Sequence, residues 1–346
     1  MKRVTVAVLA YNEERNLPAL LDSLERQSLP RDEFNVLIVD NGSTDTSRDL
    51  VRLRQMRWKN LALTIEPRPG ISFGRNRALR TAQTELIAFT DADVVCPPRW
   101  LETLVKGFDR WRTRLPNLVA VGGGNVPVTD GGDFLAAVGI TLNSFWGSHG
   151  SVQGMRFTED HEVPHIPTLN ILYDRQKVLA AGGFDEAFRF VCEDPELNHR
   201  LTQAGGRIVF LAGADVEHKM RPDFKSWMRN VYLYGRGRTQ IIKKHFDHLK
   251  AKFLVPPLIV LTLALTPLCL WHPLFLLPLF YFLVPLPIAY RLCRRAGQSR
   301  LWPMAYAILA GNPIAYGIGM IHGLWFRYPP VVPRLVRREE MDKSRD

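Results

Sequence analysis

The stretch TELIAFTDADVV, residues 84–95, joins a short apolar run to a pair of acidic residues. Leu86 to Phe89 is apolar with a β-favouring middle, which predicts a buried strand. Asp91 and Asp93 follow. Because residues i and i+2 of an extended backbone point to the same side, the two carboxylates can converge on one hard cation. Ligands of open α/β sheets bind at the carboxyl ends of strands, where this pair is expected. The alternative is that both residues only start a turn and cap the next helix.

Strands and helices alternate on both sides of this stretch, which predicts an α/β fold with a mostly parallel, Rossmann-like sheet. Asp194 precedes Pro195 and is expected to cap a late helix. For residues 130–165 the sequence predicts only a loop, which is expected to face an acceptor molecule. Strands are expected at 4–9, 34–39, 61–66, 86–89, 118–122, 166–172 and 207–216, and helices at 13–26, 46–56, 72–82, 99–112, 175–181 and from residue 194.

The chain has 346 residues and a formal net charge of +11, so it can form one or two domains and favours an anionic partner. Nucleic acid, acidic lipid and a phosphorylated substrate all fit that charge. The four cysteines show no CxxC pair and no zinc spacing, so reduced thiols are expected. The apolar run at 4–10 is too short for a signal peptide and has no cleavage site, which favours a strand.

Three long apolar runs follow one another after residue 250: Phe253–Trp271, Pro273–Tyr290 and Leu301–Phe326. The first two are each long enough to cross a bilayer. Basic residues flank the pair at both ends, which predicts a hairpin with both ends in the cytosol. The third run has positive charge on both sides, so crossing, re-entrant and interfacial arrangements all remain open.

A basic segment with interleaved aromatic residues, 221–252, precedes these runs and holds nine Lys or Arg against two Asp. This pattern predicts an interfacial segment on anionic lipid headgroups. The alternative is a solvated basic linker. Binding of nucleic acid is disfavoured, because the adjoining apolar runs explain the charge better.

Two arginines lie near the start of the helix expected from Ser72, where the macrodipole disfavours cations. Arg75 and Arg77 would be understandable there if an anion docks on the helix N-terminus and the guanidinium groups together. The alternative is that both side chains extend into solvent.

Six motifs occur in order along the chain: AYNEE (10–14), VDNGSTD (39–45), PGISFGRNRA (69–78), FTDAD (89–93), GGFDEAF (182–188) and EDPELNHRL (193–201). Together they resemble the inverting GT-A glycosyltransferases of family 2, over about residues 4 to 218. The stretch from Arg229 to Arg238 in the basic segment also resembles one found in membrane-bound bacterial members of exopolysaccharide pathways.

The resemblance implies a GT-A catalytic domain and a role for each matching residue. Asp91 and Asp93 would hold the donor diphosphate through Mn²⁺ or Mg²⁺, Asp194 would be the catalytic base, and His218 would be a further metal ligand unless it is a surface histidine. Asp40 would contact the nucleobase and Arg75 the nucleotide portion of the donor. The whole implied donor-binding set is Tyr11, Glu13, Asp40, Arg75 and Asp91, and Asn125, Glu193, Arg229 and Arg236 are assigned to the acceptor or phosphate side.

The residue types agree with this chemistry. A divalent cation neutralises the charge that develops on a nucleotide diphosphate leaving group. An acceptor hydroxyl has a very high pKa, so it needs a carboxylate in reach as it attacks. One base implies a single displacement with inversion, without a carboxylate nucleophile.

Processive synthases of the family carry a Q-x-x-R-W element, which is missing here; its nearest match is Lys225 to Arg229. Transfer of single sugars is therefore expected, from a cytosolic nucleotide sugar to a lipid-linked acceptor. Transfer to a polyprenyl phosphate is an alternative, and an inactive membrane scaffold that binds nucleotide sugars is a third. The expected division is a catalytic domain at 1–220, the interfacial segment at 221–252, a membrane region at 253–326 and a polar tail at 327–346. The expected location is the cell (inner) membrane, multi-pass, with the catalytic domain cytoplasmic.

Overall fold

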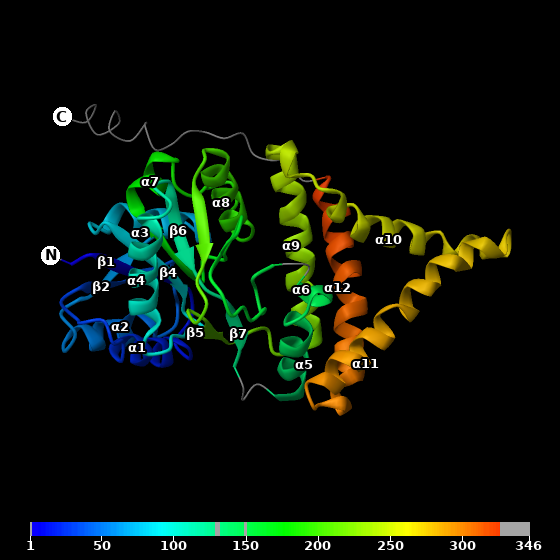
Figure 1. The fold of residues 1–346 in the computed structure, drawn as a ribbon, viewed down its shortest axis with the longest axis horizontal. Coiled ribbons are helices and arrows are strands. Elements are labelled where there is room, and N and C mark those ends of the chain that lie inside the picture. The colour runs from blue at the N-terminus through cyan, green and yellow to red at the C-terminus, as the bar shows by residue number, and fades with distance from the viewer. Residues whose placement is uncertain (1, 129–131, 149–150, 326–346) are drawn as a thin grey trace.

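A computed structural model of the chain describes residues 2–128, 132–148 and 151–325. It contains a sheet domain and a helical region, joined through the long helix α9, Phe224–Lys244 (Figure 1). The expected polar tail at 327–346 and the last residue of the third apolar run lie outside the described residues.

The large sheet has eight strands in the order β3-β2-β1-β4-β9-β6-β10-β8. All neighbours pair in parallel except β9 and β8, which confirms a mostly parallel sheet. The strands are β1 Val4–Ala10, β2 Phe34–Asp40, β3 Leu61–Ile65, β4 Leu86–Asp91, β6 Leu118–Gly122, β8 His161–Glu162, β9 Asn170–Asp174 and β10 Arg207–Phe210.

Two expected strands are placed differently. The strand expected at 166–172 is β9, which begins only at Asn170, because residues before it form a turn in which the Asn170 amide donates to Pro167. The strand expected at 207–216 is two strands. The chain leaves the large sheet after Phe210, turns at Gly213 with φ of 81°, and enters a small sheet. The small sheet consists of β5 Val94–Val95, β11 Val216–His218 and β7 Asn125–Pro127, in that order.

Helices cover both faces of the large sheet. Alternation along β1 sends Val4, Val6 and Val8 into one core with α1 and α4, whereas Ala7 enters a second core with α3 and α8. The helices of this domain are α1 Leu17–Glu25, α2 Ser47–Gln55, α3 Ile71–Thr81, α4 Trp100–Arg112, α7 Arg175–Ala180 and α8 Glu193–Gln203.

The helical region has its own core, formed by α5, α9, α11 and α12. Its helices are α5 Gly132–Leu142, α6 Phe145–Ser148, α9, α10 Val255–Ala264, α11 Pro285–Arg295 and α12 Trp302–Gly323, with short 3₁₀ segments between them. The helix α5 comes from the stretch whose structure the sequence left open. It packs on residues more than 140 positions later, such as Ala289 and Leu309.

Helices α9 and α12 lie in close contact because glycines face each other's backbone. A Cβ on Gly235 would collide with the carbonyl oxygen of Tyr316, and a Cβ on Gly319 with that of Tyr232. Small residues allow such close backbone approach between helices. Part of the segment expected to be interfacial therefore forms a helix packed on α12, and its contact with lipid headgroups stays a prediction.

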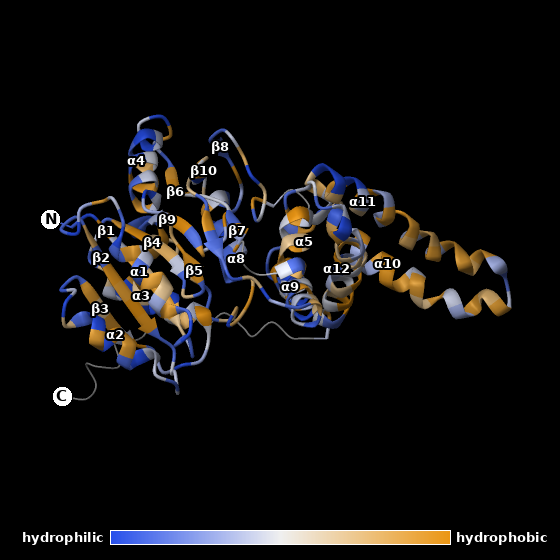
Figure 2. Cartoon of the chain, turned by 90° about the horizontal axis from the view of Figure 1, so that it is seen from below, coloured by the Kyte–Doolittle hydropathy of each residue, from blue (hydrophilic) through white to orange (hydrophobic). Residues whose placement is uncertain are grey.

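Residues 253–295 project from this core as an apolar hairpin (Figures 1 and 2). No residue of α10 or of the 3₁₀ segments at Thr266–Leu270 and Pro273–Leu283 is buried, and Trp271 is 83% exposed. Within the part of the chain that the structure describes, two stretches are long and apolar enough to cross a membrane, Pro273–Arg295 and Ser299–Gly323. The run at 253–271 is not one continuous α-helix, because Pro267 lacks the N–H that would continue α10.

Candidate active site

The acidic pair of the TDAD motif lies at the carboxyl edge of the large sheet, as the sequence predicts. Asp91 is the last residue of β4, beside Leu9 of β1, and Asp93 lies in the turn to β5. His218 of β11 pairs across the small sheet with Val94, which brings its Nε2 to 3.5 Å from Oδ2 of Asp93. The small sheet therefore brings a histidine more than 120 residues away to the acidic pair.

The acidic residues at this edge influence one another's protonation. Burial raises the pKa of Asp91, and the Arg75 guanidinium opposes that rise. Burial also raises the pKa of Glu13, and the charges of Asp93 and Asp91 raise it further. The charge of Asp93 thus acts on both Glu13 and Asp91, and carboxylate oxygens are the donors that a hard divalent cation prefers.

Asp93 and His218 stabilise each other's charged forms. Burial alone would raise the pKa of Asp93, but the hydrogen bond and charge of His218 bring it below its usual value. Burial would lower the pKa of His218, yet the pairing with Asp93 raises it. Nδ2 of Asn125 lies 3.3 Å from Nδ1 of this imidazole, so Asn125, expected on the acceptor side, orients the histidine.

Arg75 connects the acidic edge to the start of α8. It is buried on α3, forms an ion pair with Glu193, and has Nη2 3.5 Å from Oδ1 of Asp91. The anions near this helix start are thus two carboxylates of the protein. Arg77 is exposed and donates from Nε to Thr64 at 3.2 Å, which matches the solvent alternative for that residue.

Asp194 is the second residue of α8, and its side chain is 18% exposed. Its Oδ2 accepts from the Thr168 amide at 3.3 Å. The expectation that Asp194 caps the helix is wrong: Cys192 is the N-cap residue, in the left-handed region with φ of 65°, and Glu193 is already helical. Burial raises the pKa of Asp194, and the Arg75 guanidinium opposes that rise.

Sequence reasoning missed His165, whose Nε2 lies 3.9 Å from Oδ2 of Asp194. Its Nδ1 is 2.8 Å from Nδ2 of Asn198, which also donates to the carbonyl of Ile166. Burial lowers the pKa of His165 to about 3, and the charge of Arg238 contributes. The imidazole is therefore neutral near pH 7. Asn198 belongs to the EDPELN motif, and this was the only signal in the sequence.

The helix α9 was also missed as a neighbour of Asp194. A Cβ on Gly237 would meet Cys192, the residue that begins α8. Burial would lower the pKa of Arg238, but Tyr316 and Cys192 raise it, with Asp194 contributing, and Arg238 donates from Nε to Tyr316 at 3.1 Å. On the same helix Arg229 is exposed and Arg236 is half-buried, and their expected roles toward an acceptor or phosphate stay predictions.

The AYNEE and VDNGSTD motifs form a joined pair of loops. Oδ1 of Asn12 accepts from the Thr44 amide at 2.8 Å, and the Glu13 amide donates to Ser47 at 2.8 Å. Asp40 is buried and accepts from Arg48 at 2.7 Å, so contact with a nucleobase would require a change in this pair. Tyr11, which the resemblance assigns to donor binding, is 60% exposed, and its role stays a prediction.

Comparison with known proteins agrees with this arrangement. The profile of the family described as Glycosyl transferase family 2 matches residues 5–179. Glycosyltransferase AglE of Haloferax volcanii is 26% identical over 239 residues, which are 69% of this chain and 73% of that protein. Succinoglycan biosynthesis protein ExoA of Rhizobium meliloti is 28% identical over 242 residues, which are 69% and 70% of the two chains.

Among solved structures, the chain is similar to mannosyltransferase PcManGT from Pyrobaculum calidifontis in complex with GDP-Man and Mn²⁺. The TM-score is 0.56 at 23% identity, and the match covers 93% of this chain and 87% of that one. This likeness shows a shared fold.

Proposed function

The chain belongs to glycosyl transferase family 2 and is a glycosyltransferase of GT-A fold, and from this premise we propose that it transfers one sugar from a nucleotide-diphosphate sugar to a lipid-linked acceptor. The observation that carries the proposal is the position of Arg75. This one guanidinium contacts Asp91 at the donor edge and Glu193, the neighbour of Asp194. The donor and the catalytic base would therefore both lie close to the Arg75 side chain.

On the donor side, Asp91, Asp93 and His218 would hold a divalent cation, Mn²⁺ or Mg²⁺, with Glu13 close by. The action of the Asp93 charge on Glu13 and Asp91 supports this role. When bound, the cation would neutralise the charge that develops on the leaving diphosphate. Tyr11 is exposed beside these residues and would contact the nucleotide.

On the acceptor side, Asp194 would accept the proton of the attacking hydroxyl. Its raised pKa brings its basicity closer to that of a group that works near neutral pH. The Thr168 amide and the neutral His165 would hold the carboxylate in position. One base on the face opposite the leaving group corresponds to a single displacement with inversion.

We further propose that the apolar hairpin at 253–295 inserts into a bilayer, which supplies the lipid-linked acceptor. None of the residues of its helical segments between Val255 and Leu283 is buried in the protein, and Leu270 is 90% exposed. Large exposed apolar surfaces mark membrane or partner contacts. Exposed cations directly before the hairpin, Lys250 and Lys252, would face anionic headgroups.

The helix α12 would lie along the membrane surface and not cross it. It is long and apolar enough to cross, but it packs along α9, and Arg238 of α9 donates to Tyr316 within α12 at 3.1 Å. A helix with this charged neighbour is costly to place at the bilayer centre. The interfacial arrangement left open by the sequence is thus the proposed one.

The experiment is to incubate the full chain in its membranes with a panel of radiolabelled nucleotide sugars, with and without Mn²⁺ or Mg²⁺, and to extract lipid. One donor should label the lipid fraction, and only with a divalent cation present. Label in the monosaccharide-phosphate lipid fraction would favour transfer to a polyprenyl phosphate. Donor binding without transfer to any acceptor would instead indicate an inactive scaffold.

A further inference from the structure

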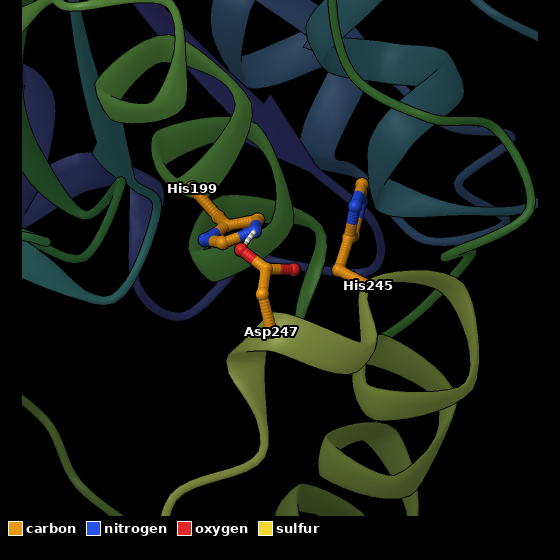
Figure 3. Close-up of side chains that lie close together, drawn as sticks. All are labelled: His199, His245 and Asp247. Carbon is orange, nitrogen blue, oxygen red and sulfur yellow. Dashed lines mark ion pairs between the residues drawn. The ribbon is translucent and has the colours of Figure 1, made fainter.

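A second cluster of metal-ligating side chains lies away from the donor edge, where α8 meets the end of α9. His199 comes from α8, His245 directly follows α9, and Asp247 lies in the 3₁₀ turn at Phe246–His248 (Figure 3). One ligand atom from each of the three lies within 4.8 Å of the others. We propose that His199, His245 and Asp247 form a binding site for a transition-metal ion of the Zn²⁺ type.

The donor types select this class of ion. Two imidazoles and one carboxylate suit Zn²⁺ and related ions, whereas Mg²⁺ and Ca²⁺ prefer oxygen ligands alone. Nε2 of His199 lies 3.2 Å from Oδ2 of Asp247, so the two ligands already point to a common position. Three protein ligands leave a further position of the ion to solvent, and Asp247, 55% exposed, stands at the open side.

The surroundings of the cluster resemble those of a built metal site. Oε1 of Glu196 lies 3.0 Å from Nε2 of His245, and such a carboxylate fixes the orientation of a ligating imidazole. His248 lies close to His199, but Arg238 donates to its Nδ1 at 3.2 Å, so it is not counted as a ligand.

The site would join two parts of the molecule. Its ligands come from α8, which carries Asp194 near its start, and from the segment that leads from α9 to the apolar hairpin. A bound ion would therefore fasten the hairpin's base to the helix that holds the proposed catalytic base. This site shares no residue with the proposed donor site at Asp91, Asp93 and His218, so it stands independently of the donor chemistry.

The test uses the full chain in detergent, stripped of metal and titrated with Zn²⁺ alone against a chromophoric chelator. Asp93→Asn serves as the background, because it weakens the other cation site. Asp247→Ala and His199→Gln are then added separately. The matched control is His272→Ala, an exposed histidine at the far end of the hairpin.

The background and the His272→Ala protein should each retain one Zn²⁺ per chain, and Asp247→Ala should lose it. The melting temperature of the background should rise with Zn²⁺, since a ligand that binds only the folded state stabilises it, and this rise should vanish in both cluster variants. His199→Gln guards against a folding defect, because its melting temperature without Zn²⁺ reports the fold. Failure of the background to retain Zn²⁺, or equal retention after Asp247→Ala, would overturn the site.

Discussion

The sheet domain and the apolar hairpin differ in which side chains they bury. The carboxyl edge of the sheet keeps charged groups inside: Arg75 and Glu193 are buried against each other, and Arg75 also contacts the partly exposed Asp91. The hairpin keeps leucine and aromatic side chains outside, with none buried in its first two thirds. The edge is therefore organised by the protein alone, whereas the hairpin needs an apolar surrounding.

This difference separates two kinds of constraint on the sequence. Each residue at the edge has a named partner, so a one-atom change should remove a function. In the hairpin the chain provides only apolar surface, so single changes should be tolerated. Between these two regions, α9 and α12 carry a third kind of constraint, because glycines are needed where their backbones come into close contact.

The largest expected effect is at the donor edge. Asp93→Asn keeps the shape of the side chain but removes its charge, so transfer that depends on Mn²⁺ or Mg²⁺ should fall by about a thousandfold, or about 4 kcal/mol in activation free energy. Steady-state transfer with and without added cation measures this. Asp49→Asn, at an exposed ion pair on α2, is the matched control and should keep wild-type turnover. Full metal-dependent turnover in Asp93→Asn would remove the metal assignment.

The next effect concerns the glycine contact between α9 and α12. Gly319→Leu introduces a side chain against the Tyr232 carbonyl, so the free energy of unfolding should fall by about 1–3 kcal/mol, as for other overpacked sites. Thermal unfolding of the full chain in detergent measures it. Ile318→Ala, on the exposed side of the same helix, should change stability by no more than about 0.5 kcal/mol. Equal effects of the two changes would mean that the helices do not pack as described.

A smaller effect is expected at His165. His165→Gln should lower kcat by about tenfold, or about 1.4 kcal/mol, with KM nearly unchanged, because Asp194 loses a neighbour that holds it. The pH profile adds a sharper readout. The raised pKa of Asp194 means that activity is lost as pH falls through that value, above the 3.8 of an ordinary aspartate. His165 stays neutral down to about pH 3, so the variant should show the same acid limb. A missing limb in the variant would assign the titration to His165.

The substitutions that should disturb the molecule least are those for a cysteine-labelling test of the hairpin. With Cys269 replaced by Ala, the remaining cysteines are buried, including Cys293. His272→Cys at the tip and Gln298→Cys at the base are exposed positions for an impermeant thiol reagent. In intact cells a crossing hairpin with a cytosolic base should label only at 272. Protection of both positions until the membrane is opened would mean that the hairpin enters one leaflet, and label only at 298 would contradict a cytosolic active site.

The parts that the sequence predicted well are those with short-range patterns. The strand before Asp91 followed from its apolar, β-favouring residues, and the mostly parallel sheet followed from the alternation of strands and helices along the chain. The edge position of Asp91 and Asp93 followed from the end of that strand. The approach of His218 came only from the family resemblance. Its cause is the small sheet, whose strands of two or three residues leave almost no signal in the sequence.

The parts that were predicted poorly depend on distant partners. The packing of α9 on α12 was not predicted, because α12 lies about 80 residues later in the chain; contact of residues 221–252 with lipid headgroups stays a prediction. The cap position at Asp194 failed because Cys192 adopts a left-handed conformation that residues other than glycine rarely show. Arg75 near the start of α3 indicated an anion at this position, and an anion is present. It is the carboxylate of Glu193, 118 residues later in the chain.

The most direct test of the proposed mechanism is a paired measurement on Asp194→Asn. The amide keeps the shape of the carboxylate and an oxygen that can accept from the Thr168 amide, and the residue does not cap α8, so folding should be unaffected. Donor affinity by calorimetry should equal that of the wild type, while transfer falls by about a thousandfold or more. Transfer within about tenfold of the wild-type rate, at equal donor affinity, would show that another group removes the acceptor proton.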